Sequence, residues 1–375
     1  MKSNKIKILI SSVGSLVGQN ILDVLDSPLF YRRNLVTIIG TNSIVSSPNN
    51  FRCNKSYIVP NTSTSEFSST MKQIISEEQP DIILSARDED TEAVTLILQN
   101  NSELKGKLPY GELKTLIYAL NKFETWNFTQ KHNLPFANSF VINKSGNIYD
   151  FKSFVEEVGY PLIAKPIQGF ASKGVFFIRN WEQAKKATHF KNYIFQEYLG
   201  QADAMNDYFK LLDELTPLFA SASGIYHHSC HTFISPTGDI DKIFISKNEH
   251  KDGATMGFRR VEHKELEKYA IAYAKAIYKE GGYGPLTVQF RLDKHGNWKA
   301  QEMNLRTNGN TLPRFIMGQD DLGLIINALL PSVDFPIYKP DTEKVSNYII
   351  GKSLLSNIML VSDIETFNKN RNWKK

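Results

Sequence analysis

Oxygen-bearing side chains gather on one face of a predicted hairpin late in the chain. Residues 284–311 alternate apolar and polar along two arms, which predicts a β-hairpin. A four-residue loop over 294–297 would pair Asp293 with Trp298, and this register sets a glutamine opposite a glutamate. Together with the next outward residue, the polar face then holds Gln289, Glu302 and Asn304. Such hard oxygen ligands suit Mg²⁺, whereas the alternative is a solvent-facing hairpin with its polar residues outward.

A cation and a flexible polar loop follow this face directly. Arg306 comes two residues after Asn304, and the run Asn308, Gly309, Asn310 comes next. A guanidinium beside a metal face suits a polyphosphate, because it donates several hydrogen bonds to phosphate oxygens. The combination favours a nucleotide site over a simple solvent-facing hairpin.

The composition limits the class of protein. A chain of 375 residues fits two or three packed domains, and 41% hydrophobic with 22% charged residues is typical of a soluble globular protein. The net charge of +5, without a long basic run before 369–375, does not indicate nucleic-acid binding. It does suit a substrate that carries several negative charges.

Cysteine usage and the apolar runs bear on the compartment. Cys53 and Cys230 are the only cysteines, which indicates a reducing compartment rather than a disulfide framework. No apolar run approaches the roughly 20 residues of a membrane span. The basic start has an apolar run over 8–10 only, so it reads as a first strand and not as a signal peptide. We expect a cytoplasmic protein.

The first third of the chain has the pattern of a doubly wound α/β unit. A short apolar strand over 6–11 is followed by a glycine turn and an amphipathic helix, and further strands are expected at 35–41, 56–59 and 81–85. Gly14 and Gly18 do not complete a dinucleotide fingerprint, so a tight turn without a ligand is favoured. The charged run 87–90 follows a strand's carboxyl end, where such sheets bind ligands, or it is a helix start capped by Asp88.

The rest of the chain divides into a small α/β piece and a larger unit. Helices are expected at 113–120, 122–132, 150–158, 181–188, 264–278 and 322–330, and strands at 162–166, 174–179, 193–198, 220–226, 231–235 and 242–247. After Pro331 we expect one further strand at 348–350, and a chain end without ordered structure.

A glycine-containing loop between two of these strands has the composition of a phosphate flap. The loop runs from Ile167 to Gly174 and includes Gly169, Ser172, Lys173 and Gly174. Glycines let the backbone approach phosphate oxygens, and Lys165 at the preceding strand end supplies a point charge. The alternative is a hairpin loop with a solvent-exposed lysine.

The strand at 193–198 ends in a bend that could recognise a base. The residues of this hinge are Gln196, Glu197, Tyr198 and Leu199. Main-chain groups there can meet an adenine edge, and Asp203 could accept hydrogen bonds from ribose hydroxyls. The alternative is an ordinary strand terminus with charged residues outward.

Flap, hinge and metal hairpin follow one another in an order that resembles the ATP-grasp enzymes. The ligand set Gln, Glu, Asn is most similar to the carbamoyl-phosphate-synthase-like branch, and GYPLIAKPIQGFASKG resembles the family's second phosphate strand and flap. Lys122, which opens NKFETWNFTQKHNLP, matches the family's first basic ATP contact. The resemblance covers about residues 8–330, and the stretch 206–218 departs from it.

The resemblance implies a fold and a set of roles. The expected fold class is α/β (α+β ATP-grasp), with a Rossmann-like domain over 1–112, a small subdomain over 113–196 and a large subdomain over 197–375. Lys122, Lys165 and the flap would bind ATP phosphates, the hinge would meet adenine, and Asp203 the ribose. The polar hairpin face would hold Mg²⁺, for which Mn²⁺ is an expected substitute. Arg306, Lys165 and Asn304 are the expected catalytic residues, with Arg306 facing the transferred phosphoryl group.

The implied reaction is ATP-dependent ligation of a carboxylate to an amine through an acyl-phosphate. The expected partners are a small-molecule carboxylate, such as an amino acid or a carboxylated sugar, and an amine, without nucleic acid or membrane; a homodimer is compatible with this. Lys247 and His250 either touch the substrate or belong to an exposed loop. The other functional hypotheses are a small-molecule kinase and a non-catalytic nucleotide-binding regulatory protein.

A histidine-rich strand raises the question of a zinc site. Its candidate ligands are His227, His228, Cys230 and His231. On a strand, alternation sends His227 and His231 to one face and the other two to the opposite face, so four ligands cannot converge. We expect no zinc there.

Overall fold

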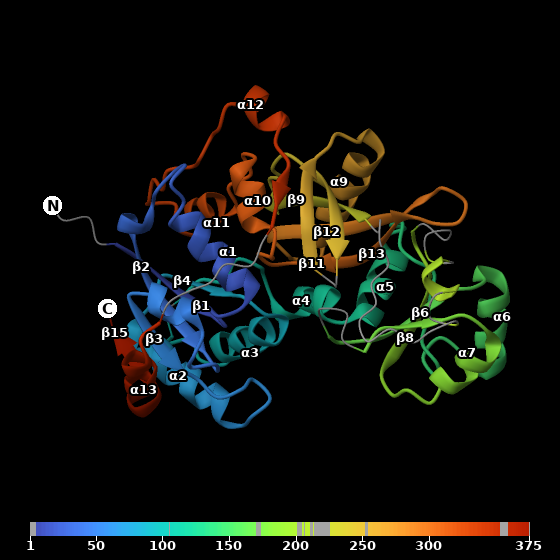
Figure 1. The fold of residues 1–375 in the computed structure, drawn as a ribbon, viewed down its shortest axis with the longest axis horizontal. Coiled ribbons are helices and arrows are strands. Elements are labelled where there is room, and N and C mark those ends of the chain that lie inside the picture. The colour runs from blue at the N-terminus through green and yellow to red at the C-terminus, as the bar shows by residue number, and fades with distance from the viewer. Residues whose placement is uncertain are drawn as a thin grey trace.

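Three β-sheets carry the fold. The computed structural model describes residues 5–104, 106–169, 174–200, 205, 207–210, 213, 226–251, 254–352 and 359–374. In Figure 1 the first sheet lies at one end of the molecule, a small sheet at the other end, and the largest sheet between and above them. Among the described helices, none is long and apolar enough to cross a membrane.

The first sheet is parallel over its four amino-terminal strands. These strands are β1 (Ile6–Ser11), β2 (Val36–Asn42), β3 (Lys55–Ile58) and β4 (Ile82–Ser85), in the spatial order β3-β2-β1-β4. Their apolar runs are buried on both faces, as a parallel sheet requires. The helices of this region are α1 (Leu16–Leu25), α2 (Glu66–Glu78) and α3 (Asp88–Gln99), with 3₁₀ turns η1 (Arg33–Leu35) and η2 (Pro48–Arg52).

The glycine turn after β1 is needed for close packing. A Cβ at Gly18 would lie 2.4 Å from the carbonyl oxygen of Val13, and a Cβ at Gly14 would lie 2.2 Å from the side-chain Nδ2 of Asn42. These contacts explain both glycines without a ligand, which agrees with the predicted tight turn.

Two helices lead from the first sheet to the small sheet. They are α4 (Leu113–Leu120) and α5 (Lys122–Lys131), and Asn121 caps α5 by accepting from the amides of Phe123 and Glu124. The small sheet has the order β5-β8-β6-β7, with β5 (Ser139–Phe140), β6 (Leu162–Pro166), β7 (Phe176–Ile178) and β8 (Tyr193–Glu197). Helices α6 (Ile148–Val158) and α7 (Trp181–Ala187) pack on it through a core that includes Phe151 and Phe195.

The largest sheet is antiparallel and carries the predicted hairpin. Its order is β13-β12-β9-β10-β11-β14, from β9 (Tyr226–Ile234), β10 (Phe244–Lys251), β11 (Ala254–Arg260), β12 (Gly284–Leu292), β13 (Trp298–Asn304) and β14 (Ile350–Gly351). Helix α9 (Lys264–Lys279) packs on one face of it. Helices α10 (Thr311–Ile316) and α11 (Asp321–Leu329) instead bury Phe315 and Leu322 against the first sheet, and α12 (Thr342–Ser346) follows. The first and third parts of the chain therefore share a core.

Two predictions about the largest sheet were wrong. The strand predicted to begin at His231 is the second half of β9, which runs unbroken from Tyr226, and β11 was not predicted at all. Apart from Tyr226, the strand predicted over 220–226 lies outside the described residues, as does most of the stretch 206–218.

The hairpin has the predicted face but not the predicted turn. Gln289 pairs with Glu302, as expected, whereas Trp298 pairs with Leu292 and not with Asp293. Asp293 lies in the loop, where its Oδ1 accepts from the amides of His295 and Asn297. The pairing shifts by one residue between Gln289 and Phe290, where Gln301 bulges out of β13 without a partner on β12. Beyond this bulge the pairing is the predicted one.

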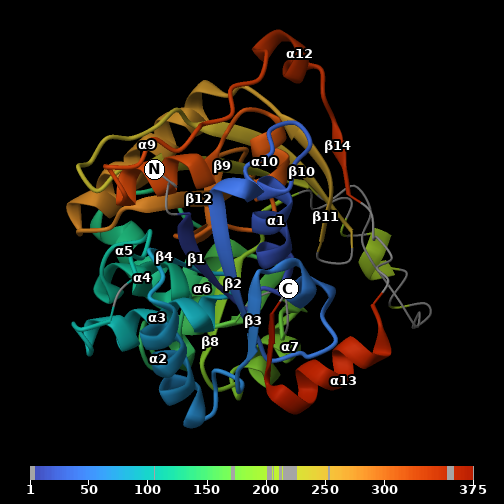
Figure 2. The same cartoon turned by 90° about the vertical axis from the view of Figure 1, so that its left-hand side faces the viewer.

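The chain end is ordered, which corrects the expectation of a loose tail. Helix α13 (Val361–Asn370) buries Phe367, and β15 (Asn372–Lys374) pairs antiparallel with β3 at the edge of the first sheet. Figure 2 shows α13 and the final strand beside β3. Phe51 packs edge-on against both Phe367 and Trp373, at centroid distances of 6.0 and 5.4 Å. The last segment therefore returns to the first sheet.

Candidate active site

A cavity of about 210 Å³ opens where the three sheets meet. Its lining comes from the start of α3, from α4 and α5, from the base of the flap and from β13. Four of the predicted site residues lie on it together: Lys122, Gly169, Glu302 and Asn304. They come from segments up to 182 positions apart in the sequence (304 minus 122), so the fold alone brings them together.

Two lysines connect the elements around the cavity. Lys122 Nζ donates to the carbonyl oxygen of Gly169 at 3.0 Å, and its amide donates to that of Ile167 at 2.9 Å. Lys165 Nζ reaches from β6 to the carbonyl oxygen of Gln301 at 3.2 Å. The helix start, the flap base and the metal hairpin are thus joined through two ammonium groups.

The positive charge of this region is only partly compensated. The pKa of Lys165 is lowered to about 8, first by burial and then by the charge of Lys122; Glu302 opposes the shift and Arg291 adds to it. Burial likewise lowers the pKa of Lys122, although Glu302 and Asp88 act in the opposite direction. Buried Nε of Arg291 has no hydrogen-bond partner among the described residues. An anionic ligand such as a triphosphate fits this site, because its negative charge would offset the burial and mutual repulsion that lower the pKa of both lysines.

The polar face of the hairpin presents oxygen atoms to the same cavity. Glu302 is exposed to it, and Asn304 Nδ2 donates to Glu302 Oε1 at 3.2 Å. Gln289 Oε1 accepts from Gln301 Nε2 at 3.3 Å and is not among the residues that line the cavity. One carboxylate and one adjacent amide suit a divalent cation that keeps water and phosphate oxygens in its other positions.

Arg306 has an acidic partner at the start of helix α3. Its Nε donates to Asp88 Oδ1, and its Nη1 donates to the carbonyl oxygen of Thr307 at 3.1 Å. Burial acts to lower the pKa of Arg306, but Asp88 outweighs this and raises it. Asp88 lines the cavity with Glu89 and Glu92, whereas Arg306 is not among the lining residues. The expected phosphoryl-facing arginine is therefore neutralised by the first residue of α3, and Asp88 is not a helix cap, since Arg87 holds that position.

The hinge turns its two polar side chains toward protein. Gln196 Nε2 donates to Ser139 Oγ at 2.7 Å, and Glu197 Oε1 accepts from Lys299 Nζ at 2.6 Å and from the amide of Asn138 at 2.7 Å. Both residues are buried. A nucleotide at this bend would therefore meet main-chain atoms rather than these side chains.

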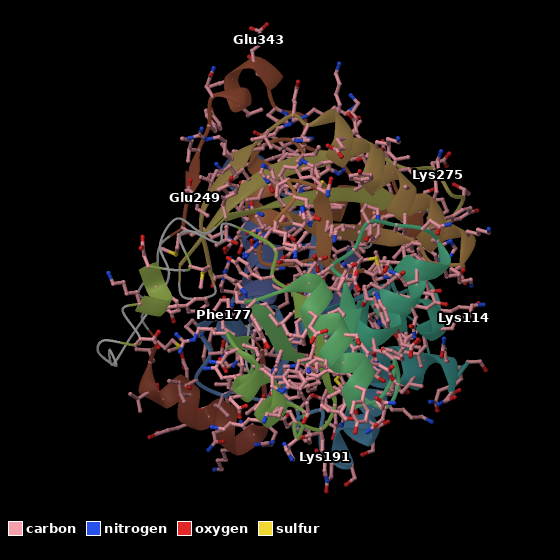
Figure 3. All side chains as sticks on the ribbon, turned by 90° about the vertical axis from the view of Figure 1, so that its right-hand side faces the viewer. Lys114, Phe177, Lys191, Glu249, Lys275 and Glu343 are labelled. Carbon is pink, nitrogen blue, oxygen red and sulfur yellow. The ribbon has the colours of Figure 1, made fainter. Side chains whose placement is uncertain are left out.

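The remaining hinge residues adjoin an aromatic cluster. Tyr198 lies 6.0 Å from the ring of Phe177, which Figure 3 labels on the small sheet, and Leu199 is buried with its carbonyl oxygen 3.4 Å from Arg291 Nη1. Gly174 and Gly169 both have positive φ, at 71° and 143°, where glycine is favoured. The predicted contacts Ser172, Lys173 and Asp203 lie outside the described residues.

The histidine-rich strand holds no metal cluster among the described residues. Cys230 belongs to the core beneath the sheet, with Val288 and Phe290. His231, on the opposite face, makes hydrogen bonds to Thr287 and Asp321. The expected alternation is confirmed.

Comparison with known proteins identifies the fold. No protein-family model matches the chain, and no curated protein matches it. An L-amino acid ligase from Bacillus licheniformis is similar in structure, with a TM-score of 0.61, 15% identity, and coverage of 90% of this chain and 78% of that chain. N5-carboxyaminoimidazole synthetase from Staphylococcus aureus, complexed with ADP, is similar with a TM-score of 0.61 and 14% identity. The match covers 88% of this chain and 79% of that chain.

A third similar structure is the biotin carboxylase domain dimer of Hydrogenobacter thermophilus 2-oxoglutarate carboxylase, in complex with MgADP, ADP and bicarbonate. Its TM-score is 0.61 at 14% identity, and the match covers 86% of this chain and 69% of that chain. The chain has the ATP-grasp fold, and the expected α/β fold class is confirmed. At these identities the likeness speaks for the fold alone.

Proposed function

We propose that this protein is an ADP-forming carboxylate–amine ligase that uses ATP and Mg²⁺. The observation that carries the proposal is the convergence of Lys122, Gly169, Glu302 and Asn304 on one cavity. The fold supports it, because each of the three similar structures belongs to an enzyme named as a synthetase, a ligase or a carboxylase. Two of those structures contain ADP or MgADP.

The roles follow from the charges around the cavity. Lys122 and Lys165 would bind phosphate oxygens, and Glu302, Asn304 and Gln289 would hold the metal, which supplies charge neutralisation for the transferred phosphoryl group. The flap that begins at Gly169 would close over the phosphates, and the backbone of 196–199 would meet the base. Arg306 would face the phosphoryl group after separating from Asp88.

The reaction consists of two displacements, each of which forms one bond and breaks another. A substrate carboxylate oxygen attacks the γ-phosphorus and ADP leaves; an amine then attacks the acyl carbon and inorganic phosphate leaves, with the amine's proton passing to solvent. The protein needs no nucleophile of its own, because positioning and charge neutralisation carry phosphoryl transfer. Exclusion of water by the flap would protect the acyl-phosphate.

The substrate class and the assembly are part of the same proposal. An amino acid or a carboxylated sugar fits a small cavity of mixed charge, which both Lys122 and the acid-rich start of α3 line. The division into 1–112, 113–196 and 197–375 is retained as the proposed domain organisation, and a homodimer as the proposed assembly. We propose that the protein acts on a pair of small molecules and binds neither nucleic acid nor a membrane.

The test measures phosphate release from ATP and Mg²⁺ with pooled carboxylates and pooled amines. We expect release that needs both pools and falls by about 10²-fold or more in Glu302→Ala, since even indirect metal supports are worth about 10–100-fold. Glu267→Ala is the matched control, because Glu267 is an exposed carboxylate on α9, away from the cavity. Transfer of the phosphoryl group to a hydroxyl without free phosphate would contradict the ligase and indicate a kinase. Release with one pool alone would indicate a kinase or an uncoupled half-reaction instead of complete ligation.

A further inference from the structure

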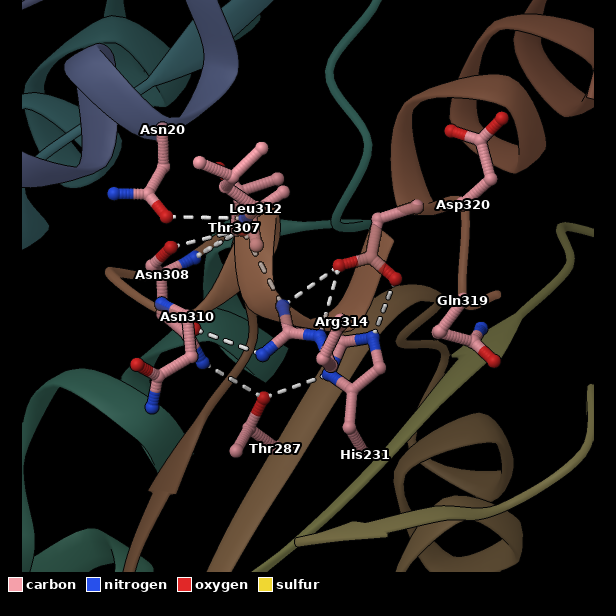
Figure 4. A network of polar contacts seen from close by, with 12 residues as sticks. Asn20, His231, Thr287, Thr307, Asn308, Asn310, Leu312, Arg314, Gln319 and Asp320 are labelled. Carbon is pink, nitrogen blue, oxygen red and sulfur yellow. Dashed lines mark hydrogen bonds and ion pairs between the residues drawn. The ribbon is translucent and has the colours of Figure 1, made fainter. Parts of the chain in front are cut away.

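Five side chains from β9, β12, the loop before α10, α10 and α11 form a closed ring of hydrogen bonds (Figure 4). Arg314 Nη2 donates to Asp321 Oδ2 at 2.6 Å, and Asp321 Oδ1 contacts His231 Nε2 at 2.8 Å. His231 Nδ1 contacts Thr287 Oγ1 at 2.8 Å, and that oxygen accepts from Asn308 Nδ2 at 3.0 Å. Arg314 Nη1 closes the ring on Asn308 Oδ1 at 2.9 Å.

Chemistry fixes the direction of every bond in this ring. A carboxylate only accepts, so His231 must carry its proton on Nε2. Burial and Arg314 lower the pKa of His231, although Asp321 opposes them, and a neutral ring leaves Nδ1 as an acceptor. The hydroxyl of Thr287 therefore donates to His231 while its oxygen accepts from Asn308. No member can be reversed without leaving a buried group unpaired.

The ring is deeply buried and charge-balanced. His231, Thr287, Arg314 and Asp321 are each at most 2% exposed. Burial acts to raise the pKa of Asp321, but Arg314 and His231 outweigh it and hold the pKa at about 2. A buried ion pair adds little net stability, because desolvation of the two charges offsets their attraction. Its effect here is to fix the positions of the side chains that it joins.

The ring holds the loop 308–310, which follows Arg306. Asn308 Oδ1 also accepts from the amide of Asn310 at 2.9 Å, so the one side chain sets the loop's conformation. Lys352, directly after β14, donates to the carbonyl oxygen of Gly309 and, at 2.7 Å, to Asn310 Oδ1. A Cβ at Gly309 would lie 2.9 Å from the side chain of Leu16 on α1. The loop 308–310 therefore connects the hairpin of β12 and β13 with helix α1 and with Lys352 of the tail, and we call it the joint.

We propose that Arg314, Asp321, His231 and Thr287 are positioning residues for the reaction. They hold the joint so that groups from the first sheet and from the tail stand in a fixed place relative to the metal face. The inference deepens the proposed ligase and rests on it. Because the ring touches the loop and not the phosphate-binding lysines, its loss should lower turnover and leave nucleotide affinity unchanged. A misplacement of about 1 Å can cost about 10²-fold in rate.

The chain supplies a matched control in the neighbouring residue. Asp320, which is 2% exposed, forms its own buried pair with Arg32 at 2.6 Å and accepts from the amide of Tyr338 at 2.9 Å. Its carboxylate also caps α11 by accepting from the amide of Gly323 at 3.1 Å. In the described part of the chain it makes no hydrogen bond to a side chain of the ring. Asp320→Asn and Asp321→Asn remove the same charge from adjacent positions, and only the second opens the ring.

The experiment compares these two variants by three measurements. MgADP affinity by calorimetry should stay within about twofold of wild type in both. The kcat for phosphate release should fall by about 10²-fold in Asp321→Asn and by less than threefold in Asp320→Asn, with KM for ATP unchanged. Amide exchange of residues 309–312 should accelerate only in Asp321→Asn. Equal kcat losses in both variants, or an unchanged exchange rate in Asp321→Asn, would overturn the proposal.

A second pair covers the case in which the Asn variants fail to fold. Thr287→Val opens the ring without a change of shape, and Thr232→Val removes a buried hydroxyl that donates to the carbonyl oxygen of Asp241 instead. The same three measurements apply, with the same expected contrast. A wild-type protein that binds no MgADP would refute the proposed function, and the exchange measurement would still decide whether the ring holds the loop.

Discussion

Lys165 is a basic residue near the cavity whose pKa is strongly lowered. It lies on β6 with its Nζ against β13, beside Lys122, and its pKa falls to about 8. With this pKa, Lys165 is about half deprotonated near pH 8. Bound phosphates would raise its pKa toward the usual value for lysine, because they supply negative charge. Nucleotide binding and protonation of Lys165 should therefore favour one another.

This linkage predicts a pH dependence of nucleotide affinity. Below about pH 8, Lys165 is already charged in the free protein, so the Kd for MgADP should be constant. Above about pH 8 the free protein must take up a proton to bind, so the Kd should rise about tenfold per pH unit. The phosphates themselves do not titrate there, because their last pKa is near about 6. Calorimetry in buffers of different ionisation enthalpy measures both the Kd and the proton uptake.

Lys165→Arg is the variant that isolates this residue, since a guanidinium keeps its charge throughout this range. We expect its Kd to stay flat from pH 8 to 10, apart from a smaller contribution from Lys122, whose pKa is also lowered. A slope as steep as that of the wild type would show that another group is responsible.

At the scale of single elements, the metal hairpin shows how a sequence pattern can predict one feature and miss another. Alternation identified the polar face, because a side-chain period of two leaves no freedom once one face is buried. The turn was wrong because Asp293 folds the loop around its own carboxylate, and the bulge at Gln301 compensates for the extra loop residue. Neither device has a signal in the alternation itself.

The chain end is the second element that the sequence did not predict. Residues 361–374 contain too few apolar positions to indicate a docked helix and strand, yet Phe367 is 0% exposed and packs against Phe51 of η2. We expect Phe367→Ala to lower the free energy of unfolding by about 3–5 kcal/mol, the usual range for a buried phenylalanine. Urea denaturation followed by circular dichroism measures it.

Leu360→Ala serves as the control for this prediction. Leu360 lies directly before α13 and is 62% exposed, so its truncation should change stability by no more than about 0.5 kcal/mol. If both variants lost equally little, α13 would not be docked in solution.

At the scale of the whole molecule, the site is assembled from parts that no local pattern relates. The patterns of the hinge, the flap and the hairpin can be recognised in the sequence because each is compact, and their functional roles stay predictions. Asp88 and Arg306 are 218 positions apart and His231 and Asp321 are 90 apart, so their pairing follows only from the arrangement of the sheets. The same holds for the return of β15 to β3, which closes the tail onto the first sheet. Such contacts decide how the lysines, the metal face and the joint loop stand to one another.

The proposed chemistry leaves a trace in the oxygen atoms of the carboxylate. Attack of that carboxylate on ATP transfers one of its oxygens to phosphorus, and displacement by the amine releases that oxygen in inorganic phosphate. The protein would be incubated with ATP, Mg²⁺, the amine pool and carboxylates labelled with ¹⁸O, and the released phosphate analysed by mass spectrometry. We expect one ¹⁸O atom in each released phosphate. Phosphate free of label would mean that water, and not a substrate carboxylate, attacks ATP, and would contradict the acyl-phosphate ligase.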